Sequence, residues 1–310
     1  MPLPTFTSPL EQTVVIVGVG LIGGSLAAAL KQSKAAGLVI GIGRDRTRIA
    51  AAHAAGLIDE WATDVSTVVD RADVIVYCTP VDHVATGVRE ANDALFQRSM
   101  SPATRPLLLT DAGSVKAPIC DELADIQKFI GSHPIAGSHR QGFEAANPQL
   151  FADRTCVLTP TSDAPVALVQ RLAKLWEAVG MQTVQMSPSE HDRALAMTSH
   201  LPHLVAAALA ATLTENNRQF TGSGFRDTTR IAAGDPELWT GILLNNAQYV
   251  CEGIDNVQKL LVSYRNALMA RDATAIQQLL TEGQDARAAL DCLLAVRHEA
   301  EKESDADAST

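Results

Sequence analysis

The stretch from Thr13 to Gln32 constrains the fold of this chain more than any other. An apolar run, TVVIV, comes first, the glycine-rich sequence GVGLIG follows, and the helical run SLAAALKQ comes next. In a strand, turn and helix of this kind, Gly18 makes the tight turn and Gly20 lets the backbone approach a pyrophosphate. Gly23 lets the helix pack closely on the sheet, and the N–H groups at the start of the helix attract the anion. The sequence therefore predicts a dinucleotide site built from Gly18, Gly20, Leu21, Ile22 and Gly23.

Short β-branched runs alternate with helical stretches from Thr13 to Ser187. The runs are Thr13–Val17, Val39–Gly43, Val74–Cys78, Leu107–Thr110, Cys156–Thr159 and Thr183–Met186. Strand, helix and strand repeated in this way are typical of α/β proteins, in which helices cover both faces of a parallel sheet. We therefore expect a Rossmann-like domain with a mostly parallel sheet over residues 13–187.

The pattern changes at Ser187, because no β-rich run follows it. Long Ala- and Leu-rich segments with helical periodicity occupy roughly 189–216, 235–270 and 272–298. A length of 310 residues also suggests two domains, at about 150 residues each. We expect an all-helical domain over residues 188–298, and its Ala-rich helices suit close packing in a domain core or a dimer interface.

Both ends of the chain are polar. Residues 1–12 contain three prolines, and residues 299–310 carry five acidic residues against the single Lys302. Such segments cannot bury enough apolar surface to offset the entropy lost on ordering. The sequence predicts a flexible N-terminus over residues 1–12 and a disordered acidic tail over residues 299–310.

Charge and composition exclude several classes of protein. Lys and Arg number 25 against 35 Asp and Glu, which gives a net charge of -10 and argues against a nucleic-acid partner. The 5 cysteines are odd in number and widely separated, so we expect no disulfide framework and a cytoplasmic protein. The N-terminus lacks a signal-peptide pattern, and the apolar run Leu204–Leu213 is about half of a bilayer span, so we expect no membrane association.

The residues after the second predicted strand bear on the choice of cofactor. NAD-binding versions of the fold usually carry an acid about 20 residues after the glycines, where it holds the ribose hydroxyls. Gly43 occupies that position here and is followed by Arg44 and Asp45. Space beside a guanidinium would accommodate a 2'-phosphate, which slightly favours NADP⁺ over NAD⁺. The alternative is that Asp45 holds the ribose of NAD⁺. Two further residues end a strand where the cofactor would lie, namely Thr79 and Pro80.

Four longer strings identify a family. They are TDAGSVK (110–116), GSHPIAGSHRQG (131–142), HDRALAMTSHLPH (191–203) and GFRDTTRIAAGDPELW (224–239). Together they resemble the prephenate and arogenate dehydrogenases of tyrosine biosynthesis, and the resemblance covers about residues 13–295. It implies an enzyme that oxidises a cyclohexadienol, passes hydride to NAD⁺ or NADP⁺ and releases the ring carboxylate as carbon dioxide. Its substrate would be prephenate, giving 4-hydroxyphenylpyruvate, or arogenate, giving tyrosine.

This chemistry needs a base for the substrate hydroxyl. The resemblance implies that His133 is this base and that Ser114 hydrogen-bonds the same hydroxyl or the imidazole. An imidazole titrates near neutral pH, which suits the task. From the residues alone, His133 before Pro134 could equally cap a strand end, and Ser114 could be a turn serine.

The substrate carboxylates need a cation. The resemblance implies that Arg230 binds one of them and that His203 is its partner in the pocket, with Trp239 nearby. A guanidinium suits the task because it binds a carboxylate through two parallel hydrogen bonds. His200 is expected to be structural. No carboxylate or cysteine at ligand spacing accompanies the two histidines, so we expect no metal ion.

One position departs from the family pattern. Where well-known members have a glutamate six residues after the catalytic histidine, this chain has His139. A neutral histidine could not pair with the ammonium group of arogenate, which favours prephenate as the substrate. The family also forms an ionic gate between this position and a pair from the neighbouring subunit of a homodimer, here Arg226 and Asp227, and His139 would alter that gate.

Other functions remain open at this point. A β-hydroxyacid dehydrogenase would share the domain plan but would rely on a catalytic lysine in the helical domain. A non-catalytic sensor of nicotinamide cofactors would keep the glycines and lose the base and the carboxylate anchor. The presence of His133, Ser114, His203 and Arg230 together favours the enzyme.

Overall fold

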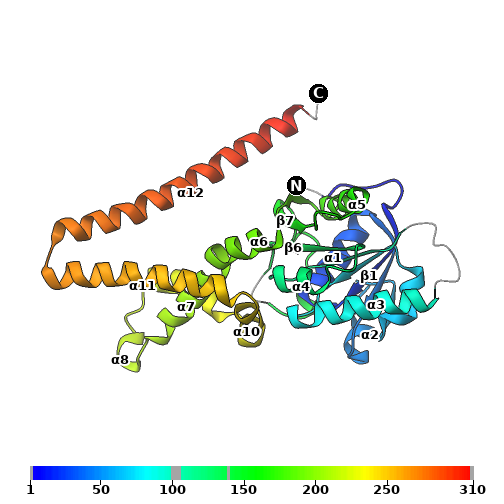
Figure 1. The fold of residues 1–310 in the computed structure, drawn as a ribbon, viewed down its shortest axis with the longest axis horizontal. Helices are drawn as coiled ribbons and strands as arrows, with labels where there is room; N and C mark the ends of the chain where they lie inside the picture. Colours follow the sequence, from blue (N-terminus) through cyan, green and yellow to red (C-terminus); the bar gives the residue numbers. More distant parts are fainter. Residues whose placement is uncertain (1–2, 99–105, 138–139, 308–310) are drawn as a thin grey trace. The chain divides into compact units, whose positions relative to one another are not determined.

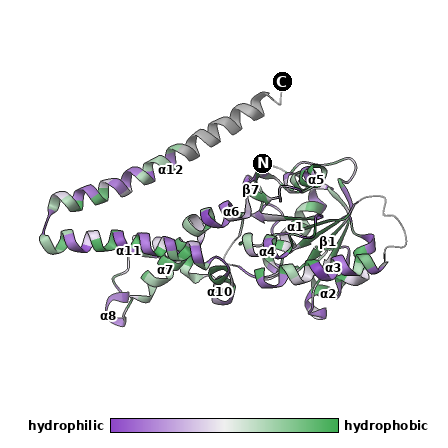
Figure 2. Cartoon of the chain, viewed as in Figure 1, coloured by the Kyte–Doolittle hydropathy of each residue, from purple (hydrophilic) through white to green (hydrophobic). Residues whose placement is uncertain are grey.

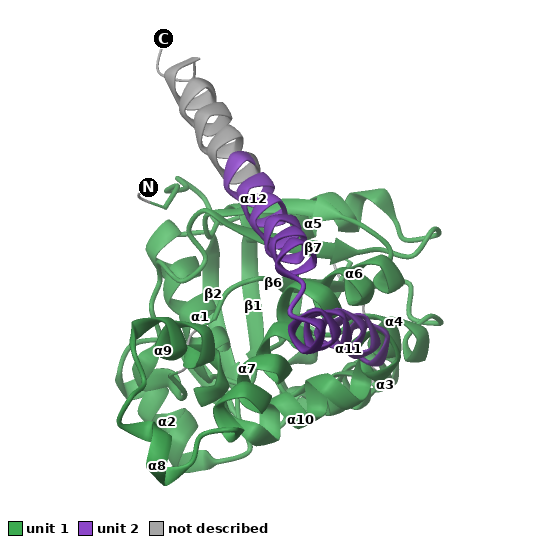
Figure 3. Cartoon of the chain, turned by 90° about the vertical axis from the view of Figure 1, so that its left-hand side faces the viewer, with its two compact units in different colours: residues 1–250 green, residues 251–310 purple. Residues whose placement is uncertain are grey.

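The computed structural model describes residues 3–98, 106–137 and 140–307 (Figure 1). The chain forms two compact units, Met1–Val250 and Cys251–Thr310, which Figure 3 colours separately. The first unit holds the whole sheet and the helices up to α10, and the second holds most of α11 and all of α12. The predicted domain boundary near Ser187 therefore lies within the first compact unit.

An eight-stranded sheet forms the centre of the first unit, in the order β3-β2-β1-β4-β5-β6-β7-β8. Neighbouring strands are parallel except β6 and β7, which are antiparallel, so the predicted mostly parallel sheet is confirmed. The strands are β1 (Glu11–Val17), β2 (Ala36–Ile42), β3 (Glu60–Ala62), β4 (Val74–Tyr77), β5 (Leu108–Asp111), β6 (Phe129–Pro134), β7 (Arg154–Thr159) and β8 (Met181–Gln185).

Two of these strands do not follow from the sequence pattern. β3 has only three residues, which is too short for an alternating pattern to show. β6 reads FIGSHP and carries Gly, Ser and Pro, which are rare in strands, yet all six of its residues are buried. Its burial between β5 and β7 selects the strand, and this strand carries His133.

Helices cover both faces of the sheet, as the sequence predicts. Because successive residues of a strand point to opposite faces, Val14 and Ile16 of β1 join one core cluster and Val15 joins the other. One face is covered by α1 (Leu21–Ser33), α2 (Arg46–Ala54) and α5 (Val166–Glu177). The other is covered by α3 (Val84–Arg98) and α4 (Ala117–Glu122). Short 3-10 turns connect them at Val65–Thr67, Val69–Arg71, Val81–His83 and Phe143–Ala145.

The N-terminal segment packs against this domain. Leu3 is buried in the core, and the backbone N–H of Phe6 donates to the Ser33 carbonyl at 2.9 Å. β1 begins at Glu11, whose carboxylate accepts two hydrogen bonds from Arg171, each 2.6 Å long. The expectation of a flexible segment over residues 1–12 is therefore wrong for residues 3–12, because Leu3 supplies apolar burial that the proline count did not reveal.

The chain from Pro188 onward is helical, as predicted. A capping box begins the first of these helices, since the Ser187 hydroxyl accepts from the Glu190 backbone N–H at 3.2 Å and the Glu190 carboxylate accepts from the Ser187 backbone N–H at 2.9 Å. The elements are α6 (Pro188–Leu195), a π-helical turn (Ala196–His200), α7 (Leu201–Ala211), α8 (Glu215–Arg218), α9 (Ser223–Thr229), η6 (Arg230–Ala233), α10 (Pro236–Asn245), α11 (Ala247–Ala270) and α12 (Ala273–Asp307).

The segment up to Val250 is held against the sheet domain. Ile242 of α10 is buried in the same cluster as Val81 and Val84, and Trp239 packs against that cluster. Beside it, the Asn245 side-chain amide donates to Asp82 at 2.6 Å. These contacts explain why the first compact unit extends beyond the change in sequence pattern at Ser187.

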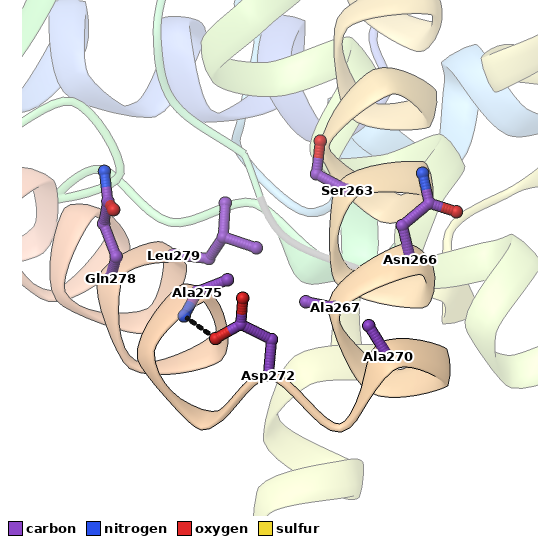
Figure 4. A pocket seen from close by; sticks show the side chains of 8 residues that line it. All are labelled: Ser263, Asn266, Ala267, Ala270, Asp272, Ala275, Gln278 and Leu279. Carbon is purple, nitrogen blue, oxygen red and sulfur yellow. Dashed lines mark hydrogen bonds between the residues drawn. The ribbon is translucent and has the colours of Figure 1, made fainter.

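The second unit contains the hairpin of α11 and α12. Figure 2 shows hydrophobic and hydrophilic residues interspersed along α11 and the coloured part of α12, and many of the leucines are exposed. A pocket near the turn is lined by Ser263, Asn266, Ala267, Ala270, Asp272, Ala275, Gln278 and Leu279 (Figure 4). Its one carboxylate, Asp272, accepts from the Ala275 N–H at 3.0 Å and so caps α12.

α12 continues to Asp307. Residues 299–307 are drawn as helix and residues 308–310 lie outside the described part of the chain, so the disordered acidic tail stays a prediction.

Among the described residues, one helical stretch, Pro188–Ala211, is long and apolar enough to cross a membrane by length and composition alone. The core helix of a protein that never enters a membrane passes the same test. This stretch holds three buried histidines, His191, His200 and His203.

Candidate active site

His133 lies near the carboxyl end of β6, and 8% of its surface is exposed. Its Nδ1 atom lies 2.8 Å from Nε2 of His191, and the two rings meet edge to face. Burial lowers the pKa of His133 well below the usual 6.5, and the neighbouring His191 and Lys116 lower it further. His133 is therefore a neutral imidazole near pH 7, able to accept a proton.

A fully buried ion pair lies beneath His133. The Lys116 ammonium donates to the Asp111 carboxylate and to the Ser132 carbonyl, the latter at 3.0 Å. The same carboxylate accepts from the Ser132 N–H at 3.1 Å and from the Gly113 N–H at 2.8 Å. These bonds join the end of β5 to β6, so they fix the backbone on which His133 is carried.

His191 and Asp192, on α6, complete this arrangement. His191 Nδ1 lies 2.7 Å from Asp192 Oδ1, and the Asp192 carboxylate also accepts the backbone N–H groups of Lys116 and Ala117, each at 2.7 Å. Both side chains are buried. The sequence analysis did not select them, although the acid that directly follows a histidine in HDRALAMTSHLPH was the available signal.

His203 and Trp239 form a second part of the site. Their rings stack with centroids 3.5 Å apart and planes 13° from parallel. Gly234 makes room for the stack, since a Cβ there would lie 2.7 Å from His203 Cε1. Burial lowers the pKa of His203. The imidazole and indole rings therefore pack face to face at this point of the site.

His200 and Asn246 connect the two parts. The Asn246 amide donates to the Asp192 carbonyl at 2.8 Å and to His200 Nδ1 at 3.0 Å. The His200 ring in turn meets Trp239 edge to face at 6.2 Å. Burial lowers the pKa of His200 to about 4, against an opposing effect of Asp192. Contacts thus run without interruption from His133 through His191 to the ring of Trp239.

The other residues predicted for catalysis and substrate binding make no hydrogen bond to His133 among the described residues. Ser114 is half-buried in the loop between β5 and α4, and no hydrogen bond between described residues joins it to His133. Arg230 is exposed at the start of η6, which packs against α7, the helix of His203. Arg226 is exposed on α9, as is Asp227. His139 lies outside the described residues.

The glycine-rich turn fits a dinucleotide. Gly18 has φ +93°, and a Cβ there would lie 2.8 Å from the Cys78 carbonyl oxygen. A Cβ on Gly23 would clash with the Gly18 carbonyl, whereas nothing lies within 4 Å of one on Gly20. Open space at Gly20 is what close approach of a pyrophosphate requires. Leu21 begins α1, followed by Ile22, and no side chain caps this helix, so its first N–H groups are available to an anion.

Thr79 supports the same reading. Its Oγ1 is buried without a hydrogen-bond partner among the described residues. Its Cγ2 lies 3.2 Å from where a Cβ on Gly18 would be, so the unpaired hydroxyl belongs to the wall of the glycine turn. A bound dinucleotide would give this hydroxyl a partner. Pro80 follows it and is exposed at the start of a 3-10 turn.

The residues that follow Gly43, after the end of β2, are exposed. Arg44 is exposed, and Asp45 Oδ1 accepts the N–H groups of Thr47 at 2.9 Å and Arg48 at 3.1 Å. Asp45 is thus the N-cap of α2. The guanidinium of Arg46 lies over the Trp61 ring at 5.6 Å. Among the described residues, no group of three His, Cys, Asp or Glu side chains is placed to hold a metal ion.

Comparison with known proteins gives a consistent result. The family model described as prephenate dehydrogenase, nucleotide-binding domain, matches residues 26–185, and the one described as prephenate dehydrogenase, dimerization domain, matches residues 187–282. The chain is 31% identical over 288 residues to the prephenate dehydrogenase of Bacillus subtilis, covering 90% of this chain and 76% of the relative. It is 32% identical over 294 residues to the cyclohexadienyl dehydrogenase of Zymomonas mobilis, covering 89% and 95%.

Solved structures give the same fold. Prephenate dehydrogenase from Aquifex aeolicus, in complex with hydroxyphenyl propionate and NAD⁺, superposes with a TM-score of 0.80 at 32% identity, covering 90% of this chain and 98% of that one. Arogenate dehydrogenase from Synechocystis superposes with a TM-score of 0.75 at 28% identity, covering 90% and 100%.

Proposed function

We propose that this chain, which belongs to the prephenate dehydrogenase family, oxidises prephenate to 4-hydroxyphenylpyruvate and carbon dioxide with hydride transfer to a nicotinamide dinucleotide. The observation that carries the proposal is the neutral, buried imidazole of His133, whose Nδ1 is already hydrogen-bonded. Its Nε2 has no hydrogen-bond partner among the described residues, so it is available to a substrate.

His133 acts as the base. Loss of hydride from the ring carbinol carbon creates carbonyl character there, so the hydroxyl proton must leave in the same process. His133 Nε2 accepts that proton, and the Lys116–Asp111 pair beneath it keeps the strand in place. A bound nicotinamide dinucleotide supplies the hydride acceptor, and Gly18, Gly20, Gly23 and Thr79 would hold it. Departure of the ring carboxylate as carbon dioxide then leaves an aromatic product.

The helical part of the site binds the substrate. Arg230 holds a substrate carboxylate through two hydrogen bonds, which suits the planar guanidinium. The stacked rings of His203 and Trp239 give the six-membered ring of the substrate a flat surface. Ser114, in the loop that follows β5, orients the substrate hydroxyl toward His133.

Arogenate is the second candidate substrate, and the resemblance to the arogenate dehydrogenase of Synechocystis favours it. His139 in place of a glutamate supports prephenate, because a neutral imidazole gives the ammonium group of arogenate no counter-charge. A steady-state assay of each substrate with each cofactor decides between them. Turnover of arogenate equal to or better than that of prephenate would overturn our choice, and turnover of neither would overturn the proposed function.

NADP⁺ is the proposed cofactor. Gly43 leaves space after β2, Arg44 is exposed beside it, and the Asp45 carboxylate is occupied in capping α2. An arginine here would bind the 2'-phosphate, and the capping bonds to Asp45 Oδ1 hold this carboxylate at the start of α2 rather than leave it free to turn toward the ribose hydroxyls of NAD⁺. In the assay above, Arg44→Ala should raise the KM for NADP⁺ about tenfold or more and leave that for NAD⁺ within about twofold. A lower KM for NAD⁺ than for NADP⁺ in the unmodified enzyme would contradict this.

We also infer that the enzyme is a cytoplasmic homodimer. The exposed leucines of α11 and α12, together with the match to a dimerization domain, support a dimer through the helical part. All five cysteines are free, which supports a reducing compartment.

A further inference from the structure

We propose that His191 and Asp192 are positioning residues that fix the tautomer of His133, so that its Nε2 is the unprotonated nitrogen. This inference rests on the proposed role of His133 as the base. It is carried by two hydrogen bonds in series, one from His133 to His191 and one from His191 to Asp192.

The proton positions follow from the donors and acceptors of the three side chains. The backbone N–H groups of Lys116 and Ala117 donate to the Asp192 carboxylate, because an N–H group can only donate. The carboxylate of Asp192 is thus an acceptor. His191 therefore carries a proton on Nδ1 and donates it to this carboxylate in a hydrogen bond. In neutral His191 the other nitrogen, Nε2, is then an acceptor. His133 must donate to it from Nδ1, and its Nε2 keeps a free lone pair.

Three elements hold this series in place. Lys116 and Ala117 belong to the start of α4, and His191 and Asp192 to α6. Asn246, between α10 and α11, donates to the Asp192 carbonyl at 2.8 Å. Because 0% of His191 and 1% of Asp192 are exposed, no water competes for these hydrogen bonds. The geometry is therefore set before substrate arrives, which is what positioning requires.

The series also stabilises the product of proton transfer. When Nε2 of His133 takes the substrate proton, the ring becomes an imidazolium that still donates from Nδ1 to His191. The negative charge of Asp192, two hydrogen bonds away, favours this cation, as the buried aspartate does in a serine protease triad. The other titratable groups that face His133 are Lys116, neutralised by Asp111, with His200 and the Cys156 thiol.

The test compares two variants of the series with a matched control. Asp192→Asn keeps an oxygen for a backbone N–H group but removes the charge, and His191→Phe keeps the ring volume but breaks the series. The control is His53→Phe, which replaces an imidazole on α2 that hydrogen-bonds the Asp59 carbonyl at 3.0 Å and lies outside the series. Far-ultraviolet circular dichroism and the Kd for NADP⁺ verify that each variant is folded.

The first readout is the tautomer itself, measured from the ¹⁵N shifts of the His133 side chain by long-range ¹H–¹⁵N correlation. Unmodified enzyme should show protonated Nδ1 and unprotonated Nε2, as should His53→Phe, whereas the two series variants should show a mixture. A His133 protonated on Nε2 in the unmodified enzyme overturns the proposal. This readout needs no turnover, so it stands apart from the proposed reaction.

The second readout is the pH profile. We expect kcat to fall about 100-fold or more in Asp192→Asn and His191→Phe with KM within about threefold, because orientation of the base acts in the chemical step. The acid limb of kcat/KM should move to lower pH in Asp192→Asn, since loss of the carboxylate disfavours the imidazolium. If kcat and the acid limb of kcat/KM were both unchanged in these variants, His191 and Asp192 would not position His133. Activity retained in His133→Asn would instead contradict the proposed function.

Discussion

The imidazole of His133 can serve as a base only while it is neutral, and its burial ensures this across the neutral range. Replacement by Asn keeps a polar side chain of similar size but removes the proton acceptor. We expect His133→Asn to lower kcat about 100-fold to 10,000-fold, the usual contribution of a general base. Binding of NADP⁺, measured by fluorescence titration, should stay within twofold or so because the glycine turn is untouched.

The pH dependence of the reaction has a definite sign. Because burial lowers the pKa of His133 below the usual 6.5, kcat/KM should stay level as the pH falls from 8 to about 6.5 and decrease only below that range. The measurement is kcat/KM for prephenate at constant ionic strength. A decrease that already begins above pH 7 would contradict a neutral buried base.

The lowered pKa of His200 leads to a prediction for the pH dependence of the free energy of unfolding. Its pKa is about 4 in the folded protein against about 6.5 in an unfolded chain. As the pH falls, the unfolded state takes up the proton first, so stability is complete above about pH 6.5 and is lost toward pH 4. The loss amounts to about 3 kcal/mol. Urea unfolding at pH 7.5 and 4.5 should show a smaller loss in His200→Asn than in the unmodified protein. The exposed His53 provides the control, and an equal loss in His200→Asn and His53→Asn would refute the prediction.

At the scale of elements, local patterns predict some parts and packing decides others. The apolar run of β1, the glycine turn and α1 are all visible in the sequence, because each follows a local rule of turn or periodicity. β6 is not visible, since Gly, Ser and Pro carry no strand pattern and burial between two strands selects it. His191 and Asp192 escape for a similar reason. Their partners are 58 and 76 residues away, at His133 and Lys116, so the adjacent histidine and acid mark the pair in the sequence but not its contacts.

The glycine turn yields a prediction from two neighbouring positions. A Cβ on Gly20 meets nothing within 4 Å, but one on Gly23 clashes with the Gly18 carbonyl. Gly20→Ala should therefore keep the melting temperature within about 2 °C and weaken NADP⁺ binding about tenfold or more, because the methyl group occupies the path of the pyrophosphate. Gly23→Ala should lower the free energy of unfolding by about 1–3 kcal/mol, the cost of an overpacked contact. Equal melting temperatures for the two variants would refute this contrast.

At the scale of the whole molecule, the exposed apolar residues of the second unit predict an interface with another protein surface. Leu260, Leu261, Val262, Leu268, Met269 and Leu280 each expose about half of their surface or more. Monomeric proteins rarely leave such residues clustered in solvent, and a second copy of the chain is the proposed cover. Leu261 and Leu268 are seven residues apart on α11, so they lie on one face of the helix.

Charged substitutions on that face test the dimer. We expect the unmodified chain to run as a dimer in light scattering coupled to size exclusion, and the double variant Leu261→Asp, Leu268→Asp to run as a monomer. Two carboxylates buried against a second copy without partners would destabilise the dimer by several kcal/mol. The remaining contacts of the interface would not offset this loss. Phe96→Asp is the matched control, because Phe96 is 84% exposed on α3, which belongs to the first compact unit, and the variant should leave the dimer intact. A double variant that remains dimeric while folded would exclude this face of α11 as the interface.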